Sequence, residues 1–215
     1  MTMSDKIDAA ALTRWILESA RIIMANQEAL SELDASTGDA DHGSNMARGF
    51  TAVVTAVEAT SSADPSTLLK DVGMTLVDTI GGSSGALYGT FFLRMARAIG
   101  GACTLDADAF ADALQAGAGG IAERGNVAVG DKTMYDALAP AVATLRSQVS
   151  AGHPLSECLN AAATAAEAGR DSTAQMVARK GRSSYMGDRA LGHVDAGSVS
   201  MALIIRAAAV TLPAA

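Results

Sequence analysis

The sequence contains few aromatic residues, prolines and cysteines. Aromatic side chains make up 4% of its 215 residues, and there are four prolines and two cysteines. Hydrophobic residues still reach 49%, so the core must be built from alanine, leucine, valine, isoleucine and methionine. Alanine has the highest helix propensity, and runs of β-branched residues are few. The composition predicts an all-α fold with closely packed helices, and the length suits one domain over residues 1–215.

Positive charge and long apolar runs are also scarce. Lysine and arginine total 16 residues against 23 acidic ones, for a net charge of −7. Without a basic stripe we expect no nucleic-acid partner, and no uncharged apolar run reaches the roughly 18 residues of a membrane span. Cys103 and Cys158 lack metal-type spacing and are typical of a reduced compartment. No apolar segment of the signal-peptide type follows Met1, so we expect a cytoplasmic protein.

Glycine, proline and polar clusters divide the sequence into eight expected helices. They fall near residues 8–30, 44–59, 65–79, 85–99, 106–123, 132–148, 154–178 and 198–211. Asp64 and Pro65 are expected to cap and begin the third. The connections 31–43, 80–84, 124–131 and 179–197 are rich in glycine and polar residues, whereas 60–64, 100–105 and 149–153 are short and plain. Alternate connections of an up-and-down bundle share one end, so the four rich ones are expected to form one site.

Residues 33–45 form the most informative motif. Asp34, Asp39 and Asp41 lie within eight residues, beside a histidine, an asparagine and two glycines. Carboxylates packed this closely repel one another unless a cation lies among them. Hard divalent cations such as Mg²⁺ prefer such oxygen ligands. The motif therefore predicts a metal-binding loop.

A solvated acidic turn and an EF-hand are the alternatives for this motif. With Asp39 and Asp41 as the first and third EF-hand positions, the required glycine would fall on Ser44 and the required glutamate on Phe50. Neither residue fits, which argues against a calcium-sensor loop. The solvated turn stays open.

Residues 81–85 form a glycine-rich segment before an expected helix. Unpaired N–H groups at a helix N-terminus and the hydroxyls of Ser83 and Ser84 suit phosphate. The alternative is an ordinary connector in which Ser84 is the N-cap. Residues 125–133 resemble a P-loop only superficially, because Asp131 separates Gly130 from Lys132 and no strand precedes them.

The longest connection, residues 181–197, contains counter-charges for phosphate. Arg182 and Arg189 can each offer a bidentate guanidinium. Asp195 either accepts from a sugar hydroxyl or caps the last helix, and His193 receives no catalytic role. Met134 is either a core residue or a flexible side chain that packs on a base. Together the motifs indicate a nucleotide held through metal ions for phosphoryl transfer.

These motifs, in this order, resemble the nucleotide-binding L subunits of dihydroxyacetone kinases. The resemblance runs essentially from end to end and is carried by residues 33–50, 81–89, 130–138 and 181–197. It implies an eight-helix, up-and-down antiparallel barrel with the nucleotide and metal site at one end. The family usually has proline at the position of Ala196.

The resemblance also implies ligand contacts. Asp34, Asp39 and Asp41 would hold two Mg²⁺ ions that bind ADP or ATP. The residues expected at the nucleotide are His42, Gly43, Ser44, Asn45, Ser83, Ser84, Gly125, Met134, Arg182, Asp195, Ala196 and Gly197. No catalytic residue is assigned to this chain, because in the family a histidine of a separate K subunit binds the ketose covalently.

The resemblance implies a phosphoryl-transfer subunit that acts on dihydroxyacetone. Bound ADP would be recharged by a phosphohistidine protein of the phosphotransferase system, or free ATP would be the donor. A related ketose such as erythrulose is an alternative acceptor. A nucleotide-sensing module that docks on a transcription regulator is the alternative outside enzymes, and the intact aspartate trio favours transfer. A metal-free structural bundle would leave the four rich connections unexplained.

Overall fold

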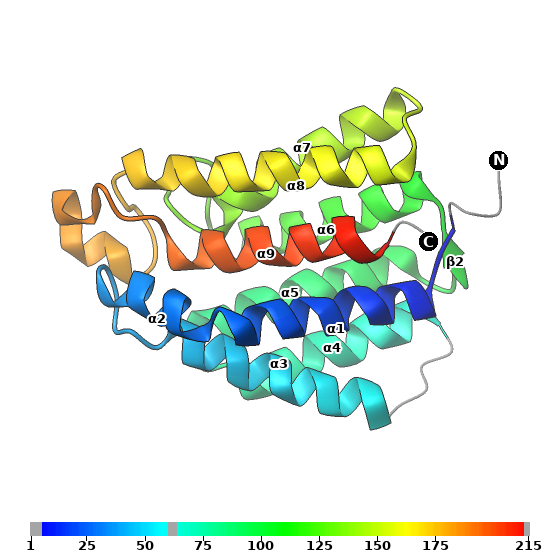
Figure 1. Ribbon diagram of the computed structural model, residues 1–215, viewed down its shortest axis with the longest axis horizontal. Helices are drawn as coiled ribbons and strands as arrows, with labels where there is room; N and C mark the ends of the chain where they lie inside the picture. Colours follow the sequence, from blue (N-terminus) through cyan, green and yellow to red (C-terminus); the bar gives the residue numbers. More distant parts are fainter. Residues whose placement is uncertain (1–5, 60–63, 213–215) are drawn as a thin grey trace.

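The computed structural model of the chain describes residues 6–59 and 64–212, which are almost entirely helical (Figure 1). The α-helices in these residues are α1 (Ala9–Ala25), α2 (Gln27–Ala35), α3 (His42–Ala59), α4 (Pro65–Thr79), α5 (Gly82–Ile99), α6 (Ala107–Gly125), α7 (Met134–Ser150), α8 (Leu155–Ser172) and α9 (Ala196–Thr211). Two 3₁₀ helices, η2 (Thr173–Gln175) and η3 (Arg182–Ala190), lie between α8 and α9. The predicted all-α class is confirmed.

The first expected helix, 8–30, is divided in the structure. α1 ends at Ala25, and α2 then extends the helical segment to Ala35. Asn26 lies at the break, where its side-chain amide donates to Ile22 O at 2.8 Å. Such local hydrogen bonds compete with the helical backbone. The expectation of a loop from residue 31 was therefore wrong, and Asp34 lies in the last turn of α2.

Several other boundaries differ from the sequence expectation, and α5 begins at Gly82 rather than at residue 85. The helix expected over 154–178 ends at Ser172 and continues as η2, and the expected loop 179–197 contains η3. Strands β1 (Ile7–Asp8) and β2 (Thr104–Leu105) pair antiparallel, although they are too short to show a sequence pattern. The predicted start of α4 is confirmed, since Asp64 accepts from Thr67 N at 2.8 Å and Pro65 follows it. Residues 60–63 of the expected connection 60–64 lie outside the described residues.

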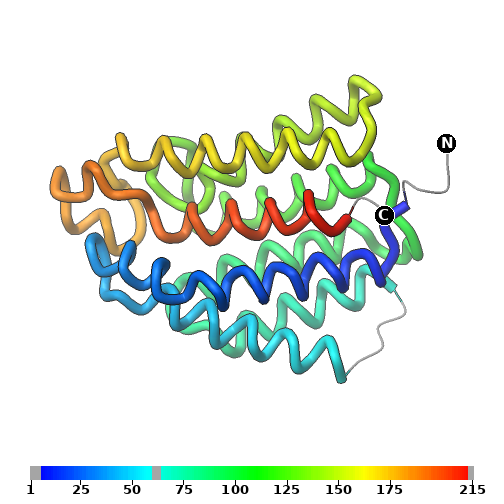
Figure 2. Tube along the Cα trace, in the orientation of Figure 1, coloured from blue at the N-terminus to red at the C-terminus, as the bar shows by residue number. Residues whose placement is uncertain are grey.

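Most helices pack against the next one along the chain, and α9 packs against α1, α7 and α8 (Figures 1 and 2). Trp15 is central to this arrangement and is completely buried. Its ring centroid lies 5.9 Å from those of Phe92 and Phe110, and its Nε1 donates to Ile204 O at 2.9 Å. One side chain of α1 therefore contacts α5, α6 and α9. The few aromatic residues are concentrated in the core.

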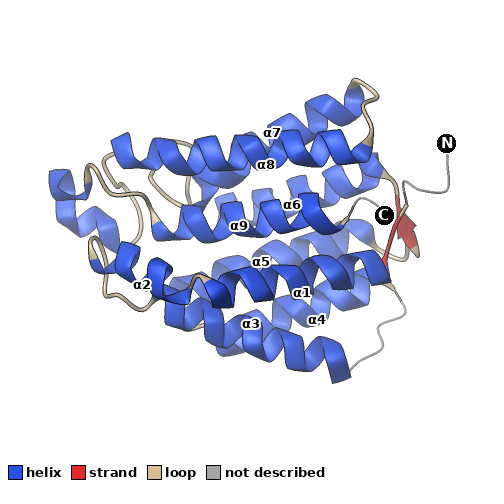
Figure 3. Cartoon of the chain, in the orientation of Figure 1, coloured by secondary structure: helices blue, strands red, loops and turns tan. Residues whose placement is uncertain are grey.

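The two ends of the molecule differ. The strand pair lies at one end, and α2, η3 and the longer loops lie at the other (Figure 3). Within residues 6–59 and 64–212, no helix is both long and apolar enough to cross a membrane.

Glycine allows α4 and α5 to approach closely. A Cβ on Gly89 would meet Val77 Cγ2 and would lie 2.8 Å from Gly73 O, so we expect Gly89→Ala to destabilise the chain by about 1–3 kcal/mol. Gly119 is an exposed glycine of α6, and a Cβ added there would have no neighbouring atom within 4 Å. Gly119→Ala should be neutral or stabilise by up to about 1 kcal/mol. Urea unfolding of both variants checks the contrast, and equal stabilities would contradict it.

Candidate functional site

A cavity of about 390 Å³ opens at the end of the molecule that contains α2 and η3. Most of its lining residues come from the α2–α3 connection, the start of α5, the α6–α7 connection and the segment from Lys180 to Gly197, and the others come from the ends of α2 and α6. These are the four polar connections of the sequence. The prediction that they share one end is confirmed.

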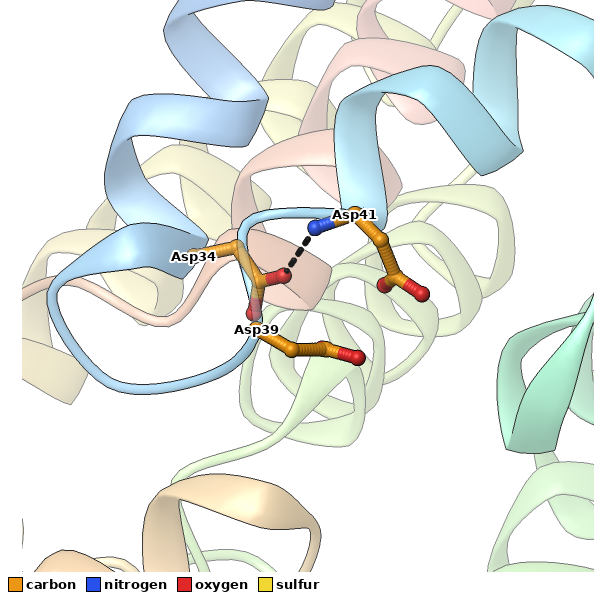
Figure 4. Close-up of side chains that lie close together, drawn as sticks. All are labelled: Asp34, Asp39 and Asp41. Atoms are coloured by element: carbon orange, nitrogen blue, oxygen red, sulfur yellow. Dashed lines mark hydrogen bonds between the residues drawn. The ribbon is translucent and has the colours of Figure 1, made fainter.

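Asp34, Asp39 and Asp41 lie together at this cavity (Figure 4). One carboxylate oxygen from each lies within 4.8 Å of the others. Asp34 Oδ2 accepts from Asp41 N at 2.9 Å and from His42 N at 3.1 Å. These N–H groups hold the Asp34 carboxylate in place while the carboxylates of Asp39 and Asp41 face it. Three converging oxygen donors on a partly exposed turn fit a hard cation such as Mg²⁺.

Arg182, in the first turn of η3, reaches this cluster. Its Nη1 lies 2.8 Å from Asp39 Oδ2, and both residues line the cavity. The sequence identified Arg182 as a counter-charge for phosphate, and the structure places it beside a predicted metal ligand. Both side chains are substantially exposed, so the pair can rearrange when a ligand enters.

Helix α5 presents its N-terminus to the cavity. It begins at Gly82, with Gly81 as its N-cap, so Ser83 and Ser84 lie in its first turn. The alternative that Ser84 is the N-cap is wrong. Both serines line the cavity, where the first N–H groups of the helix have no intrahelical partner and carry the positive end of its dipole.

Apolar side chains line another part of the wall. Gly125, the last residue of α6, and Met134, the first of α7, lie there with Leu87, Ile121 and Val127. Met134 is only 6% exposed and also contacts the core. The sequence identified the first two residues and missed the other three, because an apolar residue on a helix cannot be distinguished from a core residue without the fold.

The start of α9 completes the wall with Asp195, Ala196 and Gly197. Asp195 is the N-cap of α9 and accepts from Ser198 N at 2.6 Å. Burial raises the pKa of Asp195 to about 7, opposed by the Ser198 N–H and Lys132 and supported by the carboxylates of Asp136 and Asp34. Of the two alternatives for Asp195, the structure shows the helix cap.

A buried hydrogen-bond network lies beneath the cavity. His42 Nε2 is 2.8 Å from Ser200 Oγ, and Tyr88 OH is 2.7 Å from the same oxygen. The three residues belong to α3, α9 and α5, so the network joins three helices that begin at the site. Burial lowers the pKa of His42, and the carboxylates of Asp34 and Asp41 oppose this shift. The sequence missed Tyr88 and Ser200, which have no local motif.

Five residues singled out in the sequence do not line the cavity: Gly43, Ser44, Asn45, Arg189 and His193. Gly43 is buried where a Cβ would meet Gln27 O of α2. Ser44 Oγ donates to Asp41 O at 2.9 Å, and Asn45 Oδ1 accepts from Arg48 Nη2 at 2.6 Å. Gly43, Ser44 and Asn45 therefore stabilise the first turn of α3 and the aspartate turn before it, which contains Asp39 and Asp41.

The raised pKa of Asp195 predicts a pH-dependent stability of the ligand-free chain. The folded state holds this proton up to about pH 7, whereas the unfolded chain releases it near pH 4, so stability from this group is lost as pH rises between the two values. Asp195→Asn keeps a capping side chain but cannot ionise. We expect its Tm, relative to wild type, to increase from about pH 5 to about pH 7 and then level off. A constant difference would contradict the assignment.

Comparison with known proteins agrees with this geometry. The DAK2 domain matches residues 36–210. The chain is 40% identical over 195 residues to the ADP-binding subunit of the PEP-dependent dihydroxyacetone kinase of Escherichia coli, covering 91% of this chain and 93% of that subunit. It is 36% identical over 190 residues to the ADP-binding subunit of the PTS-dependent dihydroxyacetone kinase of Lactococcus lactis, covering 88% and 91% respectively.

A solved structure shows the same fold. The dihydroxyacetone kinase of C. freundii, crystallised with AMP-PNP and Mg²⁺, aligns with a TM-score of 0.73 and 28% identity over 97% of this chain. The aligned region is 35% of that longer protein. The chain therefore belongs to the DAK2 domain family, among the ADP-binding subunits of dihydroxyacetone kinases.

Proposed function

We propose that the chain is the phosphoryl-transfer subunit of a dihydroxyacetone kinase. It would hold ADP or ATP through two Mg²⁺ ions and pass the phosphoryl group to dihydroxyacetone bound on a separate K subunit. The observation that carries the proposal is the convergence of three carboxylates within 4.8 Å on a cavity that also receives Arg182 and the N-terminus of α5. Carboxylates, a guanidinium and free N–H groups are what a metal–polyphosphate ligand requires.

In this proposal Asp34, Asp39 and Asp41 hold the two ions. Bound Mg²⁺ would neutralise phosphate charge, which is the main requirement of phosphoryl transfer. The Asp34 carboxylate is oriented by the Asp41 and His42 N–H groups. Less conformational entropy would therefore be lost when the ions bind. Positioning of this kind, rather than covalent participation, is the contribution expected of the chain.

The nucleotide would lie across the rest of the cavity. Ser83 and Ser84 would contact the phosphates with Arg182, and Gly125 and Met134 would flank the base within the apolar wall. Asp195, Ala196 and Gly197 would complete the pocket. His42 lines the cavity beside the aspartates and would contact the nucleotide there. Gly43, Ser44 and Asn45 do not line the cavity, and they stay predicted nucleotide contacts.

The acceptor and the donor would come from partners. With the ketose held on the K subunit, this chain needs no general base of its own. The relatives from E. coli and L. lactis are PEP- and PTS-dependent, which supports recharging of bound ADP by a phosphohistidine protein of the phosphotransferase system. Free ATP as donor and a related ketose such as erythrulose as acceptor are the alternatives, since specificity for the ketose would belong to the partner.

We also propose that the helices form one domain over residues 1–215, an up-and-down antiparallel barrel. Support comes from the packing of α9 against α1, which joins the last helix of the order to the first. A cytoplasmic location is part of the proposal, because ATP and phosphotransferase-system proteins are cytoplasmic.

A nucleotide-sensing module that docks on a transcription regulator is the second candidate function. It would need nucleotide affinity but not the full aspartate trio, so the trio favours transfer. Transfer of the phosphoryl group to dihydroxyacetone in the presence of a K subunit separates the two candidates.

Native mass spectrometry of the chain, dialysed extensively in magnesium buffer, tests the proposal directly. Retained mass equal to ADP plus two Mg²⁺ would support a subunit that is recharged on the protein. An empty chain that binds added Mg·ATP would support the ATP-dependent alternative. A chain that binds neither nucleotide would contradict the proposed function.

Asp39→Ala is expected to abolish phosphoryl transfer to dihydroxyacetone, because it removes one of three converging ligands. The helical signal in far-UV circular dichroism should not change, since Asp39 lies on an exposed turn. Glu58→Ala, at the other end of α3 and exposed, is the control and should keep wild-type activity. Full activity of Asp39→Ala would refute the metal assignment.

Arg182→Ala is expected to weaken ADP retention by about tenfold or more, the usual effect of losing a charge-assisted hydrogen bond to phosphate. Arg189→Ala is the matched control, because Arg189 is exposed in the same segment, beyond the kink at Gly187, and does not line the cavity. Calorimetric titration with Mg·ADP measures both. Equal affinities of the two variants would remove Arg182 from the nucleotide site.

A further inference from the structure

Lys132, in the α6–α7 connection, is a buried lysine whose ammonium group contacts main-chain oxygens. It is 1% exposed. Its Nζ donates to Thr173 O at 2.8 Å, to Ala190 O at 2.7 Å and to His193 O at 2.6 Å. An ammonium has three N–H donors, and these contacts use all three. Although Lys132 lines the cavity, its charge is therefore committed to the protein rather than to a phosphate.

The three oxygens belong to the two ends of one segment, residues 173–193, which leads from α8 towards α9. Gly192 N donates to Ala174 O at 2.8 Å and joins the same two ends. Arg179 N donates to Asp131 O at 3.0 Å and ties the segment to the residue before Lys132. The ammonium group thus lies where both ends of the segment meet the α6–α7 connection.

The backbone at Lys132 is shaped for this contact. Its φ is +62°, a left-handed conformation that is uncommon for a residue other than glycine. The buried Asp136 carboxylate fixes the turn on either side, accepting from Gly130 N at 2.5 Å and Thr133 N at 2.7 Å. Such a conformation persists where its surroundings determine it.

Between its two ends the segment contains the residues that reach the site. Lys180, Gly181, Arg182 and Ser183 line the cavity, and Arg182 pairs with Asp39 at 2.8 Å. In Figure 1 the segment is the yellow-to-orange stretch that contains η3, at the end away from the strands. The position of Arg182 over the aspartate cluster therefore depends on where the ends of the segment are held.

We propose that Lys132 is a positioning residue, whose ammonium group clamps both ends of residues 173–193 and so holds Arg182 over the site. Its effect on ligand binding rests on the proposed nucleotide function, whereas the clamp itself is a property of the ligand-free chain. Without the ammonium, all three carbonyl oxygens lose a donor, and Thr173 O and Ala190 O keep only the N–H groups of Met176 at 3.1 Å and of His193 at 3.4 Å. The loss of three buried hydrogen bonds costs more than the loss of one exposed bond.

Limited trypsin digestion of the ligand-free chain tests the clamp, because Arg179, Lys180, Arg182 and Arg189 supply cleavage sites within the segment. In Lys132→Met we expect cleavage there to be about tenfold or more faster, with an unchanged far-UV circular dichroism spectrum. Lys70→Met, at an exposed position of α4, is the control and should match wild type. If trypsin cleaved the segment of Lys132→Met at the wild-type rate, the proposal would be overturned. Loss of the helical signal of this variant would also overturn the proposal, since Lys132 would then support the core.

Chemical rescue separates a hydrogen-bonded clamp from a packing role. Lys132→Ala removes three methylene groups and the ammonium, which propylammonium can replace. We expect propylammonium to restore slow cleavage of this variant, and tetramethylammonium, which has charge but no N–H donor, to leave it fast. Equal protection by both ions would overturn the clamp. These readouts need no nucleotide, so they stay decisive even if wild type fails to bind Mg·ADP and the proposed function is wrong.

Discussion

Close contact between helices is the constraint on which the rest of the structure depends. A core with few aromatic residues gains its buried area from many small contacts, and these require short distances between helix axes. Gly73 and Gly89 provide such a contact between α4 and α5. Trp15 joins α1 to α5, α6 and α9 through aromatic packing and one hydrogen bond. Because the helices are fixed in this way, the loops at their ends are fixed as well.

At one of these ends the carboxylates of Asp34, Asp39 and Asp41 lie close together and repel one another. Other groups of the chain reduce this repulsion. Two backbone N–H groups donate to Asp34, and the Arg182 guanidinium lies beside Asp39. The turn is therefore already formed before a cation arrives, which lowers the cost of ordering it on binding. Arg182 and a cation at Asp39 would compete for the same carboxylate. Binding of the cation would therefore favour release of Arg182 from Asp39.

The sequence was sufficient for those parts of the cavity lining that come from residues close together in the chain. The aspartate turn and the glycine-rich start of α5 were both identified, and the order of the connections predicted that they meet. Asn26 shows one limit, since α1 ends there and α2 then extends the helical segment to Ala35, so that Asp34 lies on a helix rather than in the expected loop. Lys132, Tyr88 and Ser200 show another. Their partners on other elements lie between 41 and 158 residues away, and no local pattern marks them.

Both ends of the described chain lie far from the cavity. Strand β1 and the last turn of α9 are at the end of the molecule opposite η3 (Figure 1). An additional polypeptide joined at either point would leave the mouth of the cavity open to approaching molecules. The architecture is therefore compatible with gene fusion as well as with a free-standing subunit, in keeping with a C. freundii protein in which the aligned region is about a third of the chain.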